Sequence, residues 1–144
     1  EVMDTAMKFA QARLSPPTFF FFSSEAALET LQSYFDEDTV EYKNRRDALV
    51  AELNKIEGVE VGFPSGAFYC IAKLPVKNAD DFARWLLESY DNNGETVMIA
   101  PAEGFYSTPG LGLQEVRIAY VLKIEDLVRS VQILKTALDV YNAL

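Results

Sequence analysis

The sequence predicts an α+β domain, with a small mixed sheet of about four strands and helices packed on one face. Short apolar runs bounded by Gly and Pro, typical of strands, occur in two pairs. Stretches with apolar residues every three or four positions, typical of amphipathic helices, lie before, between and after these pairs. This order of elements is typical of an α+β layer. The 144 residues are enough for one domain with its own core.

The N-terminal stretch is expected to connect this domain to a preceding part of a longer chain. Residues 1–13 have a helical pattern from the first residue, which is not an initiator methionine, and residues 15–18 break it. Four consecutive phenylalanines follow at positions 19–22. They either enter the domain's core or pack on a missing domain or subunit, since left exposed they favour aggregation. We therefore expect residues 1–22 to be a connecting helix and linker, and residues 23–144 to be the domain.

Two helices are expected at the start of the domain. Ser23 or Ser24 can cap a helix that begins at Glu25. The acidic residues 36–38 are expected to separate it from a second helix over residues 39–56. Three consecutive charged residues of this second helix are expected on its solvated face: Arg45, Arg46 and Asp47.

Four apolar runs are expected to be strands: residues 59–61, 67–74, 97–100 and 116–122. Asn78 is expected to cap a helix after the second strand, because Asp80 and Asp81 lie in its first turn. Residues 123–141 have the most regular helical spacing of apolar side chains. Cys70 is expected to be a small core residue, because nothing near it in sequence would lower its pKa.

Composition excludes several functions. A net charge of −9, from 22 acidic and 13 basic residues, is the wrong sign for binding nucleic acid. Neither a membrane-spanning run nor a signal peptide is visible, and a single cysteine fits a reducing compartment, so we expect a cytoplasmic location. Histidine is absent, which excludes a Ser-His-Asp triad, and no carboxylate spacing supports a metal site. The Gly110-Leu111-Gly112 sequence lacks the features of a phosphate loop.

One residue suggests chemistry. Arg117 follows a long loop, residues 101–115, that has no periodicity of its own. An arginine here can direct its planar guanidinium at a carboxylate or phosphate, although an arginine in a strand is more often solvated or salt-bridged. Strand alternation divides the run into two faces: Val116, Ile118 and Tyr120 on one, Arg117, Ala119 and Val121 on the other.

Three motifs in order resemble the C-terminal part of a fold-type I, pyridoxal-phosphate-dependent aminotransferase of class I/II, the aspartate aminotransferase family. They are GAFYCIAKLPV at residues 66–76, FARWLLE at 82–88, and the segment ETVMIAPAEGFY to VRIAYVL at 95–122. The resemblance covers essentially the whole chain. It implies that residues 23–144 are the small domain, a compact α+β unit that closes over the active site.

The resemblance also implies roles for two residues. The family pattern G-x-x-x-x-R-[IL] matches residues 112–118, so Arg117 would bind the α-carboxylate of an amino-acid substrate. The family's Pro-Gly-x-x-Phe-Gly pattern is replaced here by PAEGFY, residues 101–106. This departure makes Tyr106 a candidate for contact with the substrate side chain.

The family's catalytic lysine, which binds pyridoxal phosphate, belongs to the large domain, and no lysine here lies in its Ser-x-x-Lys context. We therefore expect no catalytic, cofactor-binding or metal-binding residue in this chain, and no activity from the chain alone. The implied partners are amino-acid and 2-oxo-acid substrates, the large domain of the same polypeptide and, in the full-length enzyme, a second subunit of a homodimer. The alternative is a free-standing α+β module that binds or senses a small carboxylate.

Overall fold

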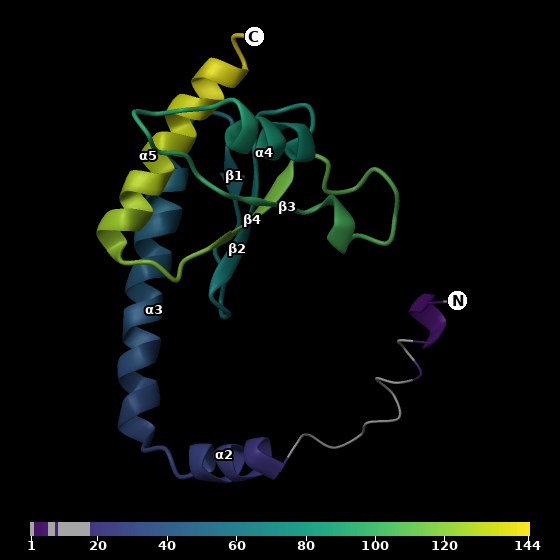
Figure 1. The fold of residues 1–144 in the computed structure, drawn as a ribbon. Coiled ribbons are helices and arrows are strands. Elements are labelled where there is room, and N and C mark those ends of the chain that lie inside the picture. The colour runs from purple at the N-terminus through teal and green to yellow at the C-terminus, as the bar shows by residue number, and fades with distance from the viewer. Residues whose placement is uncertain (1, 6–7, 9–17) are drawn as a thin grey trace. The chain divides into compact units, whose positions relative to one another are not determined.

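The structure, a computed structural model, describes residues 2–5, 8 and 18–144 (Figure 1). The chain divides into two compact units, Glu1–Asp38 and Thr39–Leu144. In the predicted N-terminal helix, residues 2–5 and 8 are helical. The rest of that helix and most of the breaker after it lie outside the described residues.

The phenylalanine run belongs to a helix, α2 (Thr18–Leu28). The predicted helix start at Glu25 is therefore wrong. Ser23 and Ser24 do not cap a helix: their hydroxyls donate to the carbonyl oxygens four residues earlier, at 3.0 and 2.8 Å. The four phenylalanines are 56–74% exposed, so they form no buried core within the first unit. In the part of the chain described, no helix is long and apolar enough to cross a membrane.

The acidic residues 36–38 do not divide two helices, because α3 (Gln32–Leu53) runs through them without interruption. The break lies earlier, between α2 and α3. The amide of Gln32 donates to the carboxylate of Asp36 one turn later, at 3.0 Å. This hydrogen bond between side chains four residues apart stabilises the helix that these residues were expected to end.

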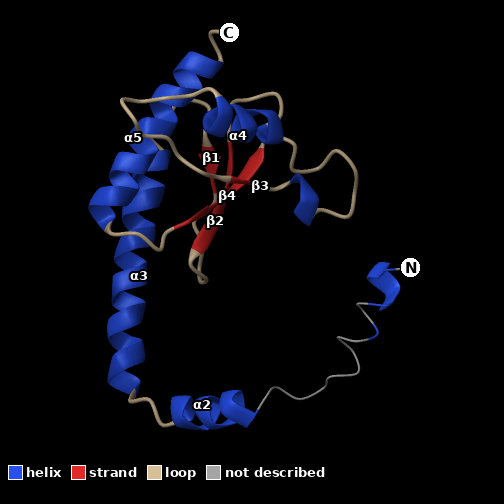
Figure 2. Ribbon diagram, viewed as in Figure 1, coloured by secondary structure: helices blue, strands red, loops and turns tan. Residues whose placement is uncertain are grey.

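The second unit contains a sheet of four strands: β1 (Glu60–Val61), β2 (Tyr69–Lys73), β3 (Ala100–Pro101) and β4 (Glu115–Ala119) (Figure 2). Their order is β1-β2-β4-β3, and all three pairings are antiparallel. The α+β class and the number of strands are confirmed. However, β3 begins at Ala100, where the predicted strand 97–100 was expected to end, and the pairing is antiparallel where a mixed sheet was predicted. Strands β1 and β2, like β3 and β4, are joined without an α-helix, and such connections favour antiparallel pairing.

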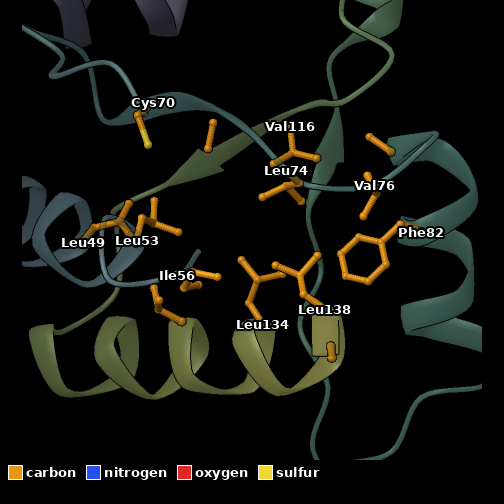
Figure 3. Close-up of a cluster of buried hydrophobic side chains, with 14 of the residues drawn as sticks. Leu49, Leu53, Ile56, Cys70, Leu74, Val76, Phe82, Val116, Leu134 and Leu138 are labelled. Carbon is orange, nitrogen blue, oxygen red and sulfur yellow. The ribbon is translucent and has the colours of Figure 1, made fainter. Parts of the chain in front are cut away.

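Three helices pack on one face of this sheet, as predicted. Alternate residues of β2 and β4 turn their side chains towards α3, α4 (Ala79–Glu88) and α5 (Ile124–Tyr141). Figure 3 shows the resulting core, which includes Leu53, Cys70, Phe82, Val116 and Leu134. The opposite face carries the exposed side chains of Tyr69, Ile71 and Arg117.

Two further predictions about this unit are confirmed. Asn78 caps α4, and its side chain accepts hydrogen bonds from the backbone N–H of Asp80 and Asp81, at 2.7 and 3.3 Å. Cys70 is a core residue with 3% of its surface exposed. Desolvation by burial raises the pKa of its thiol to about 11, so the thiolate needed for nucleophilic chemistry does not form at neutral pH.

Arg45 and Arg46 are not on a solvated face, so that prediction is wrong for both. Their side chains are 19% and 15% exposed. Arg45 donates to the carbonyl oxygen of Val121 at 2.8 Å. Arg46 donates to that of Pro64 at 3.1 Å, and its guanidinium lies 4.3 Å from the centre of the Phe63 ring. Their long apolar stems and forked head groups connect α3 to two loops of the second unit.

Candidate anion-binding site

Arg117 lies in the middle of the sheet, on the face that the helices leave uncovered. Its strand, β4, is paired on both sides, and Arg117 is opposite Ile71 of β2 and Ala100 of β3. The predicted alternation is confirmed, since Val116 and Tyr120 are buried and Arg117 is exposed. The backbone beneath the guanidinium is therefore held by two neighbouring strands.

Two aromatic rings hold the guanidinium of Arg117. Its central carbon, Cζ, lies 5.3 Å from the centre of the Tyr69 ring and 5.1 Å from that of the Phe105 ring. Both distances are within the range of cation–π attraction. Among the residues that the structure describes, no carboxylate forms an ion pair with Arg117, whereas Arg129, for example, pairs with Glu95 at 2.5 Å. The N–H donors of Arg117 are thus available to an incoming anion.

The guanidinium opens into a small pocket with a volume of about 240 Å³. Six residues line it: Tyr69, Ile71, Ala102, Phe105, Tyr106 and Arg117. The arginine is the one charged group of this lining, and aromatic or aliphatic groups make up most of the rest. Such a pocket suits a small organic molecule with one anionic group and an apolar part.

The loop that bears Phe105 is fixed by its own contacts. It contains a short 3₁₀ helix, η1 (Glu103–Phe105), and the backbone N–H of Ala102 donates to the carbonyl oxygen of Glu115 at 2.9 Å. The hydroxyl of Tyr106 donates to the carboxylate of Glu115. This hydrogen bond to a carboxylate raises the pKa of the Tyr106 phenol.

Gly112 allows the loop to close on itself. Its φ is +74°, and a Cβ atom there would lie 2.6 Å from two carbons of the Tyr106 ring. Glycine is therefore required both by the backbone conformation and by the approach of the ring. This contact is a physical reason for the glycine that begins the family pattern at residues 112–118.

The last residues before β4 are tied to the connection between β2 and α4. The carbonyl oxygens of Leu113 and Gln114 accept from the backbone N–H of Ala79 and Leu74, at 2.7 and 2.8 Å. The side-chain amide of Gln114 also donates to the carbonyl oxygen of Val76 at 2.7 Å. These contacts fix where β4 begins, and hence the position of Arg117 relative to the pocket.

The structure thus brings together the two residues singled out in the sequence, Arg117 and Tyr106, in one pocket. Sequence reasoning missed the two rings beside Arg117, Tyr69 and Phe105, and it missed Glu115, which binds Tyr106 from outside the pocket lining. Strand alternation and antiparallel pairing would have placed Tyr69 on the face of Arg117. Phe105 had no such signal, because it lies in a loop without periodicity.

Comparison with known proteins gives the family. A sequence model of the aminotransferase class I and II family matches residues 1–134, so the chain belongs to this family. The aspartate aminotransferase of Rhizobium meliloti (strain 1021) is 29% identical over 142 residues, covering 90% of this chain and 32% of the relative. The probable aspartate/prephenate aminotransferase of Aquifex aeolicus (strain VF5) is 32% identical over 128 residues, covering 82% of this chain and 30% of the relative.

Solved structures of aminotransferases also match this chain. An alanine aminotransferase from Pyrococcus furiosus matches with a TM-score of 0.73 and 28% identity, covering 92% of this chain and 32% of that one. The aspartate aminotransferase from Rhizobium meliloti matches with a TM-score of 0.70 and 27% identity, covering 94% of this chain and 35% of that one. This chain therefore spans about a third of the length of the relatives that it matches.

The family implies pyridoxal phosphate, but the pocket of Arg117 does not fit a covalent site for it. Such a site needs a lysine amine beside the bound ring. No lysine lines the pocket of Arg117. Lys55 and Lys73 are engaged with Glu52 and Glu60, at 2.5 and 2.8 Å. The described residues also contain no group of three or more Cys, Asp or Glu that could hold a metal ion.

Proposed function

We propose that residues 23–144 are the C-terminal small domain of an aminotransferase, and that Arg117 binds the α-carboxylate of its amino-acid substrate. The complete enzyme would transfer an amino group between an amino acid and a 2-oxo acid. One observation carries the proposal: an arginine without an ion-pair partner among the described residues is held between two rings in a pocket of about 240 Å³.

The arrangement suits recognition of a carboxylate. The planar guanidinium can make two parallel N–H···O bonds, which fix the orientation of the carboxylate as well as its position. The rings of Tyr69 and Phe105 restrict the guanidinium, so less side-chain freedom is lost when substrate binds. An oriented α-carboxylate in turn orients the bonds at the substrate's Cα, which is the centre that reacts. We propose that Tyr106 contributes a wall of the pocket near the substrate side chain.

The reacting groups would come from the rest of the polypeptide. Since no lysine lines the pocket, we propose that the large domain of the same polypeptide holds the pyridoxal phosphate, and that residues 1–22 connect to that domain. The chain's coverage of about a third of its relatives supports this division. The isolated chain should neither transaminate nor attach the cofactor: adding pyridoxal phosphate should produce no new absorbance band that depends on one lysine.

Further partners follow from the same proposal. Members of the family implied by the sequence are usually homodimers, and the exposed phenylalanines 19–22 offer an apolar surface for another domain or subunit. The substrates would be an amino acid and a 2-oxo acid. A single, buried cysteine, Cys70, is compatible with the reducing cytoplasm, which we propose as the location.

Arginine replacement in the polypeptide that carries both domains tests the proposal. Arg117→Ala should lower kcat/KM for amino acids by roughly 10- to 100-fold, the range for losing a hydrogen bond between charged groups. Arg117→Lys should recover only part of this loss, because it keeps the charge without the fork. Arg84→Ala is the matched control, since Arg84 is exposed on α4 and outside the pocket lining. Kinetics of the two Arg117 variants equal to those of the control would refute the role of Arg117.

The alternative is a free-standing module that uses the same pocket to bind a small carboxylate. The unpaired Arg117 favours this alternative, because residues of this chain alone form a pocket in which the guanidinium is accessible to a ligand. Calorimetric titration of the isolated chain with amino acids separates the two. Tight binding, together with a reading frame that encodes no lysine-bearing domain, would favour the module over the enzyme.

A further inference from the structure

Arg117 has an acidic neighbour that it does not pair with. Glu115 lies two residues earlier on β4 and therefore on the same face of the sheet. Residues so spaced on a strand have Cα atoms roughly 7 Å apart, a separation that a glutamate and an arginine can bridge. Opposite charges at such a short separation normally attract. Nevertheless, no ion pair between Glu115 and Arg117 occurs within the described residues.

The carboxylate of Glu115 is instead bound by the hydroxyl of Tyr106. This face also carries Lys73, directly opposite Glu115 on β2, and Glu60, opposite Lys73 on β1. These two bind each other at 2.8 Å. The cation nearest in register to Glu115 is thus already engaged, and Tyr106 supplies the hydrogen bond that Glu115 receives.

The position of Tyr106 is set by the loop. Its ring lies against Gly112, where a Cβ atom would come within 2.6 Å of it. Its backbone N–H donates to the carbonyl oxygen of Glu103 at 3.1 Å, which closes η1. The raised pKa of its phenol keeps the hydroxyl protonated, and therefore a donor, at neutral pH and above.

We propose that Tyr106 is a positioning residue that holds the carboxylate of Glu115 away from Arg117, so that the guanidinium stays free for the substrate carboxylate. This inference rests on the proposed function of Arg117. Without the hydroxyl, Glu115 turns to Arg117 and forms an ion pair within the chain. A substrate must then displace that pair before it binds.

A double-mutant cycle in the polypeptide that carries both domains tests this, with Tyr106→Phe, Glu115→Gln and the two combined. Tyr106→Phe should raise KM for amino acids about two- to fivefold, the range for an exposed ion pair, with a smaller change in kcat. The rise should shrink at high salt, which screens the competing pair. With Glu115→Gln already present, Tyr106→Phe should raise KM no further, because no charge remains to compete.

Two results would overturn the inference: no rise in KM for Tyr106→Phe, or an equal rise with and without Glu115→Gln. The second would mean that Tyr106 serves only the structure of the loop. If circular dichroism shows that Tyr106→Phe disturbs the fold, the same cycle with Tyr106→Leu decides. If Arg117→Ala leaves the kinetics unchanged, the proposed function itself fails. If Arg117→Ala lowers kcat/KM but the cycle shows no coupling, only this inference fails.

Discussion

The loop in front of β4 gives the sharpest stability prediction. Gly110 and Gly112 both have positive φ, +84° and +74°, in the region where residues other than glycine are strained. They differ in surroundings. A Cβ atom at Gly110 would meet nothing within 4 Å, whereas one at Gly112 would lie 2.6 Å from the Tyr106 ring. Alanine at the two positions therefore imposes the same kind of backbone strain, and only Gly112→Ala adds a steric clash.

The magnitudes follow from this difference. Holding a non-glycine residue in the left-handed region costs about 1–2 kcal/mol, which is the expected loss for Gly110→Ala. Forcing an extra carbon into an occupied space costs roughly a further 1–3 kcal/mol. Gly112→Ala should thus lower the free energy of unfolding clearly more than Gly110→Ala. It should also displace the Tyr106 ring and so weaken the hydrogen bond to Glu115.

Equilibrium urea denaturation of the two variants and the unsubstituted protein measures these values, read from the transition midpoints at constant slope. Equal destabilisation by both variants would show that the Tyr106 ring does not limit the space at Gly112. No destabilisation by either would refute the backbone conformations of the loop.

Two further predictions concern the core. Tyr120→Phe removes a hydroxyl that donates to the carbonyl oxygens of Gly66 and Ala67, at 3.2 and 3.0 Å. This substitution should lower the free energy of unfolding by about 0.5–1.5 kcal/mol. Its melting temperature should therefore be lower than that of the control Tyr34→Phe, which changes an exposed tyrosine. The thiol of Cys70 should resist iodoacetamide at pH 8 until the protein unfolds, and rapid labelling of the folded protein would contradict its burial. Burial raises the pKa of this thiol from 9.0 to about 11 in the folded state. The protonated thiol therefore contributes fully to the free energy of unfolding below pH 9.0, and this contribution is lost as the pH rises towards 11.

Periodicity predicted the second unit well. Alternation along β4 placed Arg117 on the face opposite Val116, and apolar spacing predicted α4 and α5, because these elements obtain their stability from burying one side. Periodicity did not predict α2 correctly, because the described side chains of this helix are all exposed and it has no buried side to give an apolar spacing. Ser23 and Ser24 misled for a related reason, since a serine hydroxyl can cap a helix or bond within one.

The site was predictable only in part. The spacing from Gly112 to Arg117 predicted the arginine's role through family resemblance, and the structure gives that glycine its reason in the Tyr106 ring. The contact between Phe105 and Arg117 depends on the path of an irregular loop. Neither the helical nor the strand periodicity of apolar residues predicts such a path. The bond between Tyr106 and Glu115 has the same origin, since it joins a loop to a strand.

The most direct measurement of the central claim pairs the arginine with the group it binds. In the polypeptide that carries both domains, kcat/KM is measured for an amino acid and for its carboxamide, with and without Arg117→Ala. We predict that the unsubstituted enzyme prefers the carboxylate by roughly 10- to 100-fold, and that Arg117→Ala reduces this preference to near one. An unchanged preference in the Arg117→Ala enzyme would show that another residue binds the carboxylate.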